Sequence, residues 1–227
     1  MASELNSEKV KEYGLKAGAS VVGIAASEDF DLALDGFKPT DALEGCLSVI
    51  VLGCPLPQEA ILNDPIGFID VRNELSTKMT DIAKKVAKQI KSDGYKTKAV
   101  GGMSGKWVNG MTVGSISLKH AAELAGLGVI SKNYLLTNPD YGNILWFSAV
   151  LTDARLVPDE KLQYAICGSC NKCVEACPSK ALGGDHSSFV KKECAGTMFK
   201  NVNGKWEIVC FLCRKVCPYR FGGQVES

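Results

Sequence analysis

The sequence predicts an α/β domain over residues 1–157, followed by a small cysteine-rich domain over residues 158–227. Apolar residues spaced for helices and for strands alternate through the first part, which is the pattern of an α/β domain. Eight of the ten cysteines fall in the last part of the chain. A length of 227 residues is enough for one sizeable domain and one small one.

The first part of the chain is predicted to contain two buried strands. Residues 47–53 (Leu-Ser-Val-Ile-Val-Leu-Gly) form an unbroken apolar run, as in a strand that is covered on both faces. In order, we expect a helix over 7–17 ended by Gly18, a strand over 19–25, a short helix and loop over 29–39, a strand over 47–53 and a loop over 54–57.

The clearest helix covers residues 70–92. Its apolar residues recur every three or four positions and form one stripe: Val71, Leu75, Met79, Ile82, Val86 and Ile90. The glycine-rich residues 101–110 lack the spacing of a phosphate loop, and they form either a surface loop or a functional lid. Around them we expect a strand over 96–100, a helix over 117–125 capped by Ser117, and strands over 134–137 and 144–152.

The composition is that of an ordinary globular protein, with 46% hydrophobic residues and a mean hydropathy of +0.04. The net charge of +1 gives no sign of attraction to nucleic acid, so we expect no nucleic-acid partner. No apolar run approaches the ~18 residues that cross a membrane, and the polar, acidic start lacks the layout of a signal peptide. We therefore expect a cytoplasmic protein. The iron–sulfur clusters that the cysteines below predict are usually oxygen-sensitive, so we also expect a reducing compartment and activity under anaerobic conditions.

Two cysteine runs carry the strongest functional signal. The first has the C-x2-C-x2-C-x3-C-P spacing of bacterial ferredoxins: Cys167, Cys170, Cys173, Cys177 and then Pro178. In that motif a tight loop places three thiolates on three irons of one 4Fe–4S cluster, and the fourth cysteine reaches a neighbouring cluster. The second run contains Cys210, Cys213, Cys217 and then Pro218, and Cys194 stands alone between the runs.

If the last cysteine of each run binds with the other run, and Cys194 joins the second run, two complete sets of four ligands result. The first set is Cys167, Cys170, Cys173 and Cys217, and the second set is Cys177, Cys194, Cys210 and Cys213.

Two alternatives to iron–sulfur clusters fit these cysteines less well. A disulfide scaffold is typical of short secreted chains, and a zinc ion is usually held by two C-x2–4-C pairs. We therefore predict two 4Fe–4S clusters, and inert thiols at the remaining Cys46 and Cys54.

Further motifs, together with the cysteine runs, resemble one family. They are residues 125–136 (Ala-Gly-Leu-Gly-Val-Ile-Ser-Lys-Asn-Tyr-Leu-Leu), 138–142 (Asn-Pro-Asp-Tyr-Gly) and 150–153 (Val-Leu-Thr-Asp). The chain resembles epoxyqueuosine reductase and its relatives, which include the cobalamin-dependent reductive dehalogenases. The resemblance is specific over about residues 120–219 and weaker before them.

The resemblance implies a nitroreductase-like, cobalamin-binding α/β domain followed by a ferredoxin-like domain with two 4Fe–4S clusters. Electrons would enter through an exposed cluster, pass to an inner cluster held by the second set, and reduce the cobalt of the corrinoid. The residues that would contact the corrinoid, or FMN in its place, are Gly126, Gly128, Lys132, Asn133, Tyr141 and Thr152. For Lys132 and Asn133 a plain turn with a solvated lysine is an equally simple interpretation.

Several positions depart from the family pattern. Thr112 stands where epoxyqueuosine reductases carry a proton-donating aspartate, and a threonine cannot replace a carboxylic acid in that role. Ser131 replaces a frequent glycine, and Cys194-Ala-Gly-Thr replaces a Cys-Ile-Ser-Tyr signature. The sequence also ends soon after Tyr219, without the helical-repeat extension of some relatives that act on tRNA. We therefore expect a substrate other than epoxyqueuosine.

Three functions remain open on the sequence alone, and it assigns no catalytic residue. The first is an iron–sulfur oxidoreductase whose clusters reduce a bound corrinoid. The second is an electron-transfer protein that reduces a partner enzyme or a partner corrinoid protein. The third is a flavin-dependent reductase. In each case we expect a low-potential electron donor such as ferredoxin or flavodoxin.

Overall fold

The computed structural model describes residues 5–31, 33–103, 106–108, 111–163 and 166–223, without the side chains of 106–108, 111–113 and 186. The chain forms two compact units, each built from three segments. The first unit comprises Met1–Cys54, Leu75–Leu127 and Trp146–Leu162, and the second comprises Pro55–Glu74, Gly128–Leu145 and Gln163–Ser227. A boundary between residues 157 and 158 stays a prediction.

A four-stranded sheet with the order β1-β2-β8-β3 is the centre of the first unit. Strand β1 (Val21–Ala26) runs antiparallel to β2 (Ser48–Pro55), and β3 (Thr97–Val100) runs antiparallel to β8 (Leu145–Thr152). Every residue of β2 before Pro55 is buried, which confirms a strand covered on both faces. The predicted loop over 54–57 is wrong in its start, because β2 continues through Pro55.

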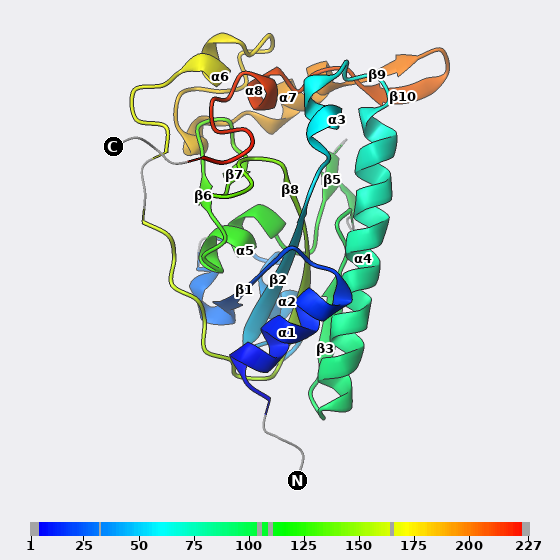
Figure 1. Cartoon of the computed structure of the whole chain (residues 1–227), viewed down its shortest axis with the longest axis vertical. Helices are drawn as coiled ribbons and strands as arrows, with labels where there is room; N and C mark the ends of the chain where they lie inside the picture. Colours follow the sequence, from blue (N-terminus) through cyan, green and yellow to red (C-terminus); the bar gives the residue numbers. More distant parts are fainter. Residues whose placement is uncertain (1–4, 32, 104–105, 109–110, 164–165, 224–227) are drawn as a thin grey trace. The chain divides into compact units, whose positions relative to one another are not determined.

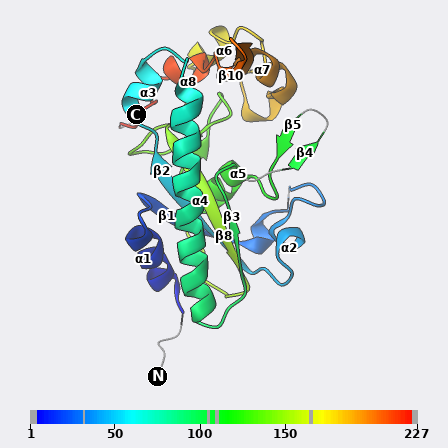
Figure 2. The same cartoon turned by 90° about the vertical axis from the view of Figure 1, so that its right-hand side faces the viewer.

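Helices α1 (Ser7–Ala17) and α4 (Phe68–Ser92) are confirmed close to their predicted bounds. Gly18 ends α1 with a φ of +107°, a left-handed conformation that favours glycine. Figure 2 shows α4 lying along one face of the sheet. The predicted apolar stripe of α4, from Leu75 to Ile90, packs there against Ile24, Ile50 and Val150. This layer forms the main hydrophobic core of the first unit.

Helix α5 (Leu118–Leu124) packs on the opposite face of the sheet. Neighbouring residues of a strand point to opposite faces, so Gly23 faces α5 where Ile24 faces α4. A Cβ atom added at Gly23 would lie 2.3 Å from the carbonyl oxygen of Ala125. The predicted cap of α5 is wrong in its contact, because the Ser117 hydroxyl lies 2.7 Å from Nδ1 of His120 and makes no capping hydrogen bond.

Part of the glycine-rich segment is a strand, since β4 (Lys106–Val108) pairs antiparallel with β5 (Met111–Val113). Residues 104–105 and 109–110 of the segment lie outside the described residues. Thr112 lies in β5, but its side chain is outside the described residues. The other short elements of the first unit are a 3-10 turn at Ser27–Asp29 and α2 (Pro39–Ala42). The second unit contains α3 (Gln58–Leu62), β6 (Val129–Ile130) and β7 (Leu136–Thr137).

In the second unit each cysteine run contains one turn of helix. Helix α6 (Lys172–Glu175) starts before Cys173, α8 (Leu212–Lys215) starts before Cys213, and the two helices lie side by side (Figure 1). The remaining elements are a 3-10 turn at His186–Ser188, α7 (Lys191–Met198), β9 (Phe199–Val202) and β10 (Lys205–Ile208). Within the described residues, no helix is long and apolar enough to cross a membrane.

Candidate iron–sulfur centre

Four cysteines line one cavity of the second unit. Three are the closely spaced Cys167, Cys170 and Cys173 of the first run, and the fourth is Cys217, the last cysteine of the second run. The side-by-side packing of α6 and α8 brings these distant parts of the sequence together. This grouping is the one that the crossed assignment expects for the first set. The role of its members as cluster ligands stays a prediction.

The cysteines of the second set are also neighbours. Cys177 belongs to a small buried apolar group with Ala181, Leu182 and Cys173 of the first set, against which Cys194 and Cys213 pack. Burial raises the pKa of Cys213 to about 12, and negative charge on the nearby Cys194 and Cys210 acts in the same direction. Such a thiol needs a positive centre close by before it can carry a charge.

Burial is the main electrostatic feature of the first set as well. It raises the pKa of Cys173 and of Cys217, and the neighbouring Cys167 adds to both shifts. Cys177 of the second set differs. Burial acts to raise its pKa, but hydrogen bonds from Ser179 and from backbone N–H groups outweigh burial, so the pKa is lowered. The iron of a bound cluster would supply the positive charge that buried thiolates require.

The donor set fits iron–sulfur clusters chemically. Both groups consist of soft thiol sulfurs, and no carboxylate or imidazole lines the cavity of the first set. No group of three or more His, Cys, Asp or Glu side chains within the described part of the chain is arranged around a single metal ion. A 4Fe–4S cluster takes one thiolate at each iron, so its ligands surround a volume instead of converging on a point.

Lys132 is not a solvated lysine. Its ammonium group donates hydrogen bonds to the carbonyl oxygens of Gly168 (3.0 Å) and Cys170 (3.1 Å) and to Oδ1 of Asn171 (3.0 Å). One cation thus holds the loop that presents the first three cysteines. Its predicted contact with a corrinoid or flavin stays a prediction.

We expect the change Lys132→Met to loosen this loop. Hydrogen bonds to a charged group are each worth about 1.5–3 kcal/mol, less where water reaches them, so the iron of the first set should leave faster to a chelator. Iron per chain after timed exposure to a chelator measures the effect. The control is Lys200→Met, since Lys200 is an exposed lysine on β9. Equal iron loss from both variants would contradict the role of Lys132.

Asn133 and Ser131 line the cavity of the first set. Asn133 is 4% exposed, and its amide donates to the carbonyl oxygen of Cys213 (3.4 Å) and accepts from the N–H of Leu135 (3.1 Å). The Ser131 hydroxyl lies 2.7 Å from the Thr137 hydroxyl. The segment from residue 131 to 133 therefore braces both cysteine runs.

The other residues predicted to contact a corrinoid have clear structural positions. Gly126 (φ +68°) and Gly128 (φ +156°) lie where a Cβ atom would meet a backbone oxygen, that of Glu160 at 2.4 Å and of Thr137 at 2.5 Å. Tyr141 is half-buried in a turn, where its N–H donates to Oδ1 of Asn138. Thr152 is fully buried, and its hydroxyl accepts from the N–H of Ala154. Their contact with a cofactor stays a prediction.

Sequence reasoning missed Arg214 and Asn143, which lie beside the cysteines. Arg214 is 7% exposed and donates to Asn143, which is 1% exposed. Arg214 was visible in the sequence as an arginine between Cys213 and Cys217. Nothing in the spacing indicated Asn143, because a long stretch of chain separates it from the second run.

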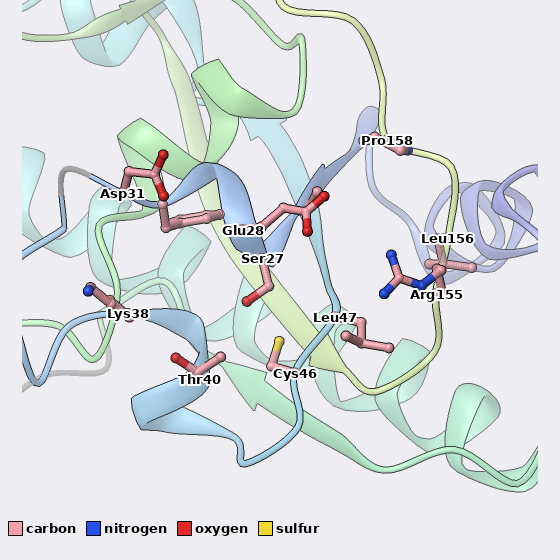
Figure 3. Close-up of a pocket in the computed structure, with 12 residues that line it drawn as sticks. Ser27, Glu28, Asp31, Lys38, Thr40, Cys46, Leu47, Arg155, Leu156 and Pro158 are labelled. Atoms are coloured by element: carbon pink, nitrogen blue, oxygen red, sulfur yellow. The ribbon is translucent and has the colours of Figure 1, made fainter.

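The first unit has its own cavity, of about 330 Å³, beside the end of β1 (Figure 3). Ser27 and Cys46 face it, and the buried Ser27 hydroxyl makes no hydrogen bond of normal geometry among the residues that the structure describes. Burial raises the pKa of Cys46, as expected for an inert thiol. Acidic and basic side chains both line this cavity, so its charge favours no class of ligand: Glu28, Asp31, Lys38 and Arg155.

Comparison with known sequences finds epoxyqueuosine reductases. That of Lactococcus garvieae is 34% identical over 110 residues, which are 44% of this chain and 31% of the relative. That of Listeria monocytogenes is 33% identical over 118 residues, or 48% of this chain and 31% of the relative. The matched part is thus about a third of the length of these relatives. No family model matches the sequence.

Solved structures show the fold. An epoxyqueuosine reductase bound to a tRNA stem loop matches 94% of this chain and 64% of its own, with a TM-score of 0.63 and 21% identity. A catabolic reductive dehalogenase matches 96% of this chain and 32% of its own, with a TM-score of 0.68 and 21% identity. The predicted resemblance and fold class are therefore confirmed: the chain has the mixed α/β fold of these proteins, with eight of its ten cysteines in the C-terminal part.

Proposed function

We propose that this protein is an iron–sulfur oxidoreductase that passes electrons through two 4Fe–4S clusters to a corrinoid bound by the α/β domain. The observation that carries the proposal is the cavity shared by Cys167, Cys170, Cys173 and Cys217. Three cysteines of one run and the last of the other meet there, as in the two-cluster ferredoxin motif. When bound, the clusters would supply one-electron transfer and the corrinoid a strongly reducing cobalt.

The chain's own residues hold and shield these groups. The first set would bind the outer cluster, and the second set would bind the inner cluster among buried apolar side chains. Lys132 fixes the ligand loop through its three hydrogen bonds. Because hydrogen bonding and solvent access set the potential of a cluster, the different surroundings of the two sets favour two different potentials.

The corrinoid is supported by the fold. One solved reductive dehalogenase with a TM-score of 0.67 to this chain is described as acting by B12-dependent dehalogenation. The residues proposed to border the corrinoid are Gly126, Gly128, Lys132, Asn133, Tyr141 and Thr152. The α/β domain of this family also resembles the flavin nitroreductases, so FMN is the alternative cofactor.

We propose a substrate other than epoxyqueuosine in tRNA. Thr112 occupies the position of the family's acid, and its hydroxyl is no proton donor at neutral pH. A related epoxyqueuosine reductase does bind a tRNA stem loop, so tRNA is the substrate to exclude first. The electron donor would be a low-potential protein such as ferredoxin or flavodoxin.

The deciding experiment is an ultraviolet–visible spectrum of anaerobically purified protein with iron, sulfide and cobalt assays, before and after addition of cobalamin. We expect about eight irons and eight sulfides per chain, and a shift in the cobalamin spectrum on binding. About four irons, or zinc in their place, would overturn the two-cluster assignment. Clusters without corrinoid or flavin binding would favour the alternative function, an electron carrier that reduces a partner protein.

A further inference from the structure

Asn143 has a buried amide with unused hydrogen-bonding capacity. The residue is 1% exposed and sits at the end of the 138–143 turn, where its backbone N–H donates to the carbonyl oxygen of Arg220 (3.1 Å). Its side-chain nitrogen Nδ2 is buried and makes no hydrogen bond within the described residues. A buried amide nitrogen without a partner is costly, so a missing acceptor is expected beside it.

Arg214 holds this amide in place. Its Nη1 donates to the backbone oxygen of Asn143 and lies 3.5 Å from the side-chain Oδ1 of the same residue. With the oxygen end of the amide turned to Arg214, the Nδ2 end points elsewhere. The guanidinium is itself buried, and no carboxylate forms an ion pair with it within the described part of the chain. A buried cation of this kind needs a negative partner.

The cysteines beside these two groups supply what each lacks. Arg214 directly follows Cys213, and its carbonyl oxygen accepts a hydrogen bond from the N–H of Cys217 (3.3 Å). Arg220, whose carbonyl oxygen accepts from Asn143, donates its own N–H to the carbonyl oxygen of Cys217 (3.2 Å). Asn143 thus contacts the chain on both sides of Cys217, and the Arg214 guanidinium is next in the chain to a cysteine of the second set and bonded through its backbone to one of the first.

We propose that Asn143 and Arg214 form a tuning pair for the two clusters: Asn143 Nδ2 donates an N–H···S hydrogen bond to Cys217, and Arg214 is the fixed counter-charge shared by both clusters. The inference rests on the proposed function, because it requires clusters at these cysteines. Donated hydrogen bonds and positive charge both stabilise the reduced, more negative cluster. Both groups therefore raise the reduction potential.

The two residues should affect different clusters. Asn143 touches only the cluster that takes Cys217, so Asn143→Leu, which removes the N–H donor at similar size, should lower that potential alone. Arg214 lies between Cys213 and Cys217, so Arg214→Met should lower both potentials, and Arg214→Lys should keep most of the wild-type values because it keeps the charge. These are positioning residues, and neither contacts a substrate in this scheme.

The experiment is an anaerobic redox titration of the wild type and these variants, followed by visible absorption and electron paramagnetic resonance. The matched control is Lys200→Met, because Lys200 is an exposed lysine on β9 and water screens its charge. We expect a clear shift to more negative potential in Asn143→Leu and Arg214→Met, and little change in the control.

Each outcome has a defined meaning. Wild type without iron would refute the proposed function, whereas wild type with about eight irons and unshifted potentials in Asn143→Leu and Arg214→Met would refute only the tuning pair. Equal shifts in Lys200→Met would also refute it, because burial would then be irrelevant. If Arg214→Met fails to assemble, Asn143→Leu and Arg214→Lys decide: a shift in the first with retention in the second supports the pair, and any other result overturns it.

Discussion

Replacing Cys217 with serine should remove one cluster and leave about four irons per chain. The remaining cluster should be the one held by the second set, although Cys217 belongs in sequence to the second run. The reason is geometric, since Cys217 lines the same cavity as Cys167, Cys170 and Cys173. A hydroxyl is a much poorer iron ligand than a thiolate, so the loss should be large.

The crossing of ligands is tested by comparing spectra of paired variants. If the ligands cross, Cys217→Ser and Cys170→Ser leave the same residual electron paramagnetic resonance signal, and Cys177→Ser and Cys210→Ser leave the other. If they do not cross, Cys217→Ser would match Cys210→Ser, which would sink the assignment. Cys54→Ser is the control, because it makes the same chemical change at a buried thiol in the first unit and should keep about eight irons.

Gly142→Ala should be among the most destabilising single changes in the second unit. Gly142 has a φ of +59°, and a Cβ atom there would lie 2.2 Å from the carbonyl oxygen of Tyr219 and 2.3 Å from the carbonyl carbon of Arg220. The left-handed backbone costs an alanine roughly 1–2 kcal/mol, and displacing a packed backbone costs about 1–3 kcal/mol more. Because the displaced segment directly follows Cys217, the cluster of the first set should also lose iron.

The control separates conformational strain from the clash. Gly204 has a φ of +85°, but nothing lies within 4 Å of an added Cβ atom, so Gly204→Ala should cost only the backbone term. Unfolding in urea, followed anaerobically by circular dichroism, compares the two variants, and iron per chain reports the site. Equal stability of Gly142→Ala and Gly204→Ala would show that the 138–143 turn can move away from residues 219–220.

Structural features that depend on residues close together in the chain were predictable from the sequence alone. The period of the apolar residues in α4, the unbroken run of β2 and the glycine that ends α1 depend on neighbours in the chain, so their positions were predictable. The spacing of the first cysteine run likewise implied a cluster, because a tight loop reaches several irons at once. The hairpin β4–β5 was missed, because its strands are only three residues long.

The sequence by itself therefore determined the chemistry of the candidate ligands, seven thiols in two runs and Cys194 between them, because spacing over a few residues limits which atoms a cysteine loop can reach. Only the tertiary structure decided what surrounds them. It joined Lys132 to the loop of the first run by hydrogen bonds, and it buried Arg214 against Asn143. Such contacts join residues far apart in the chain, and they depend on packing that no local pattern encodes.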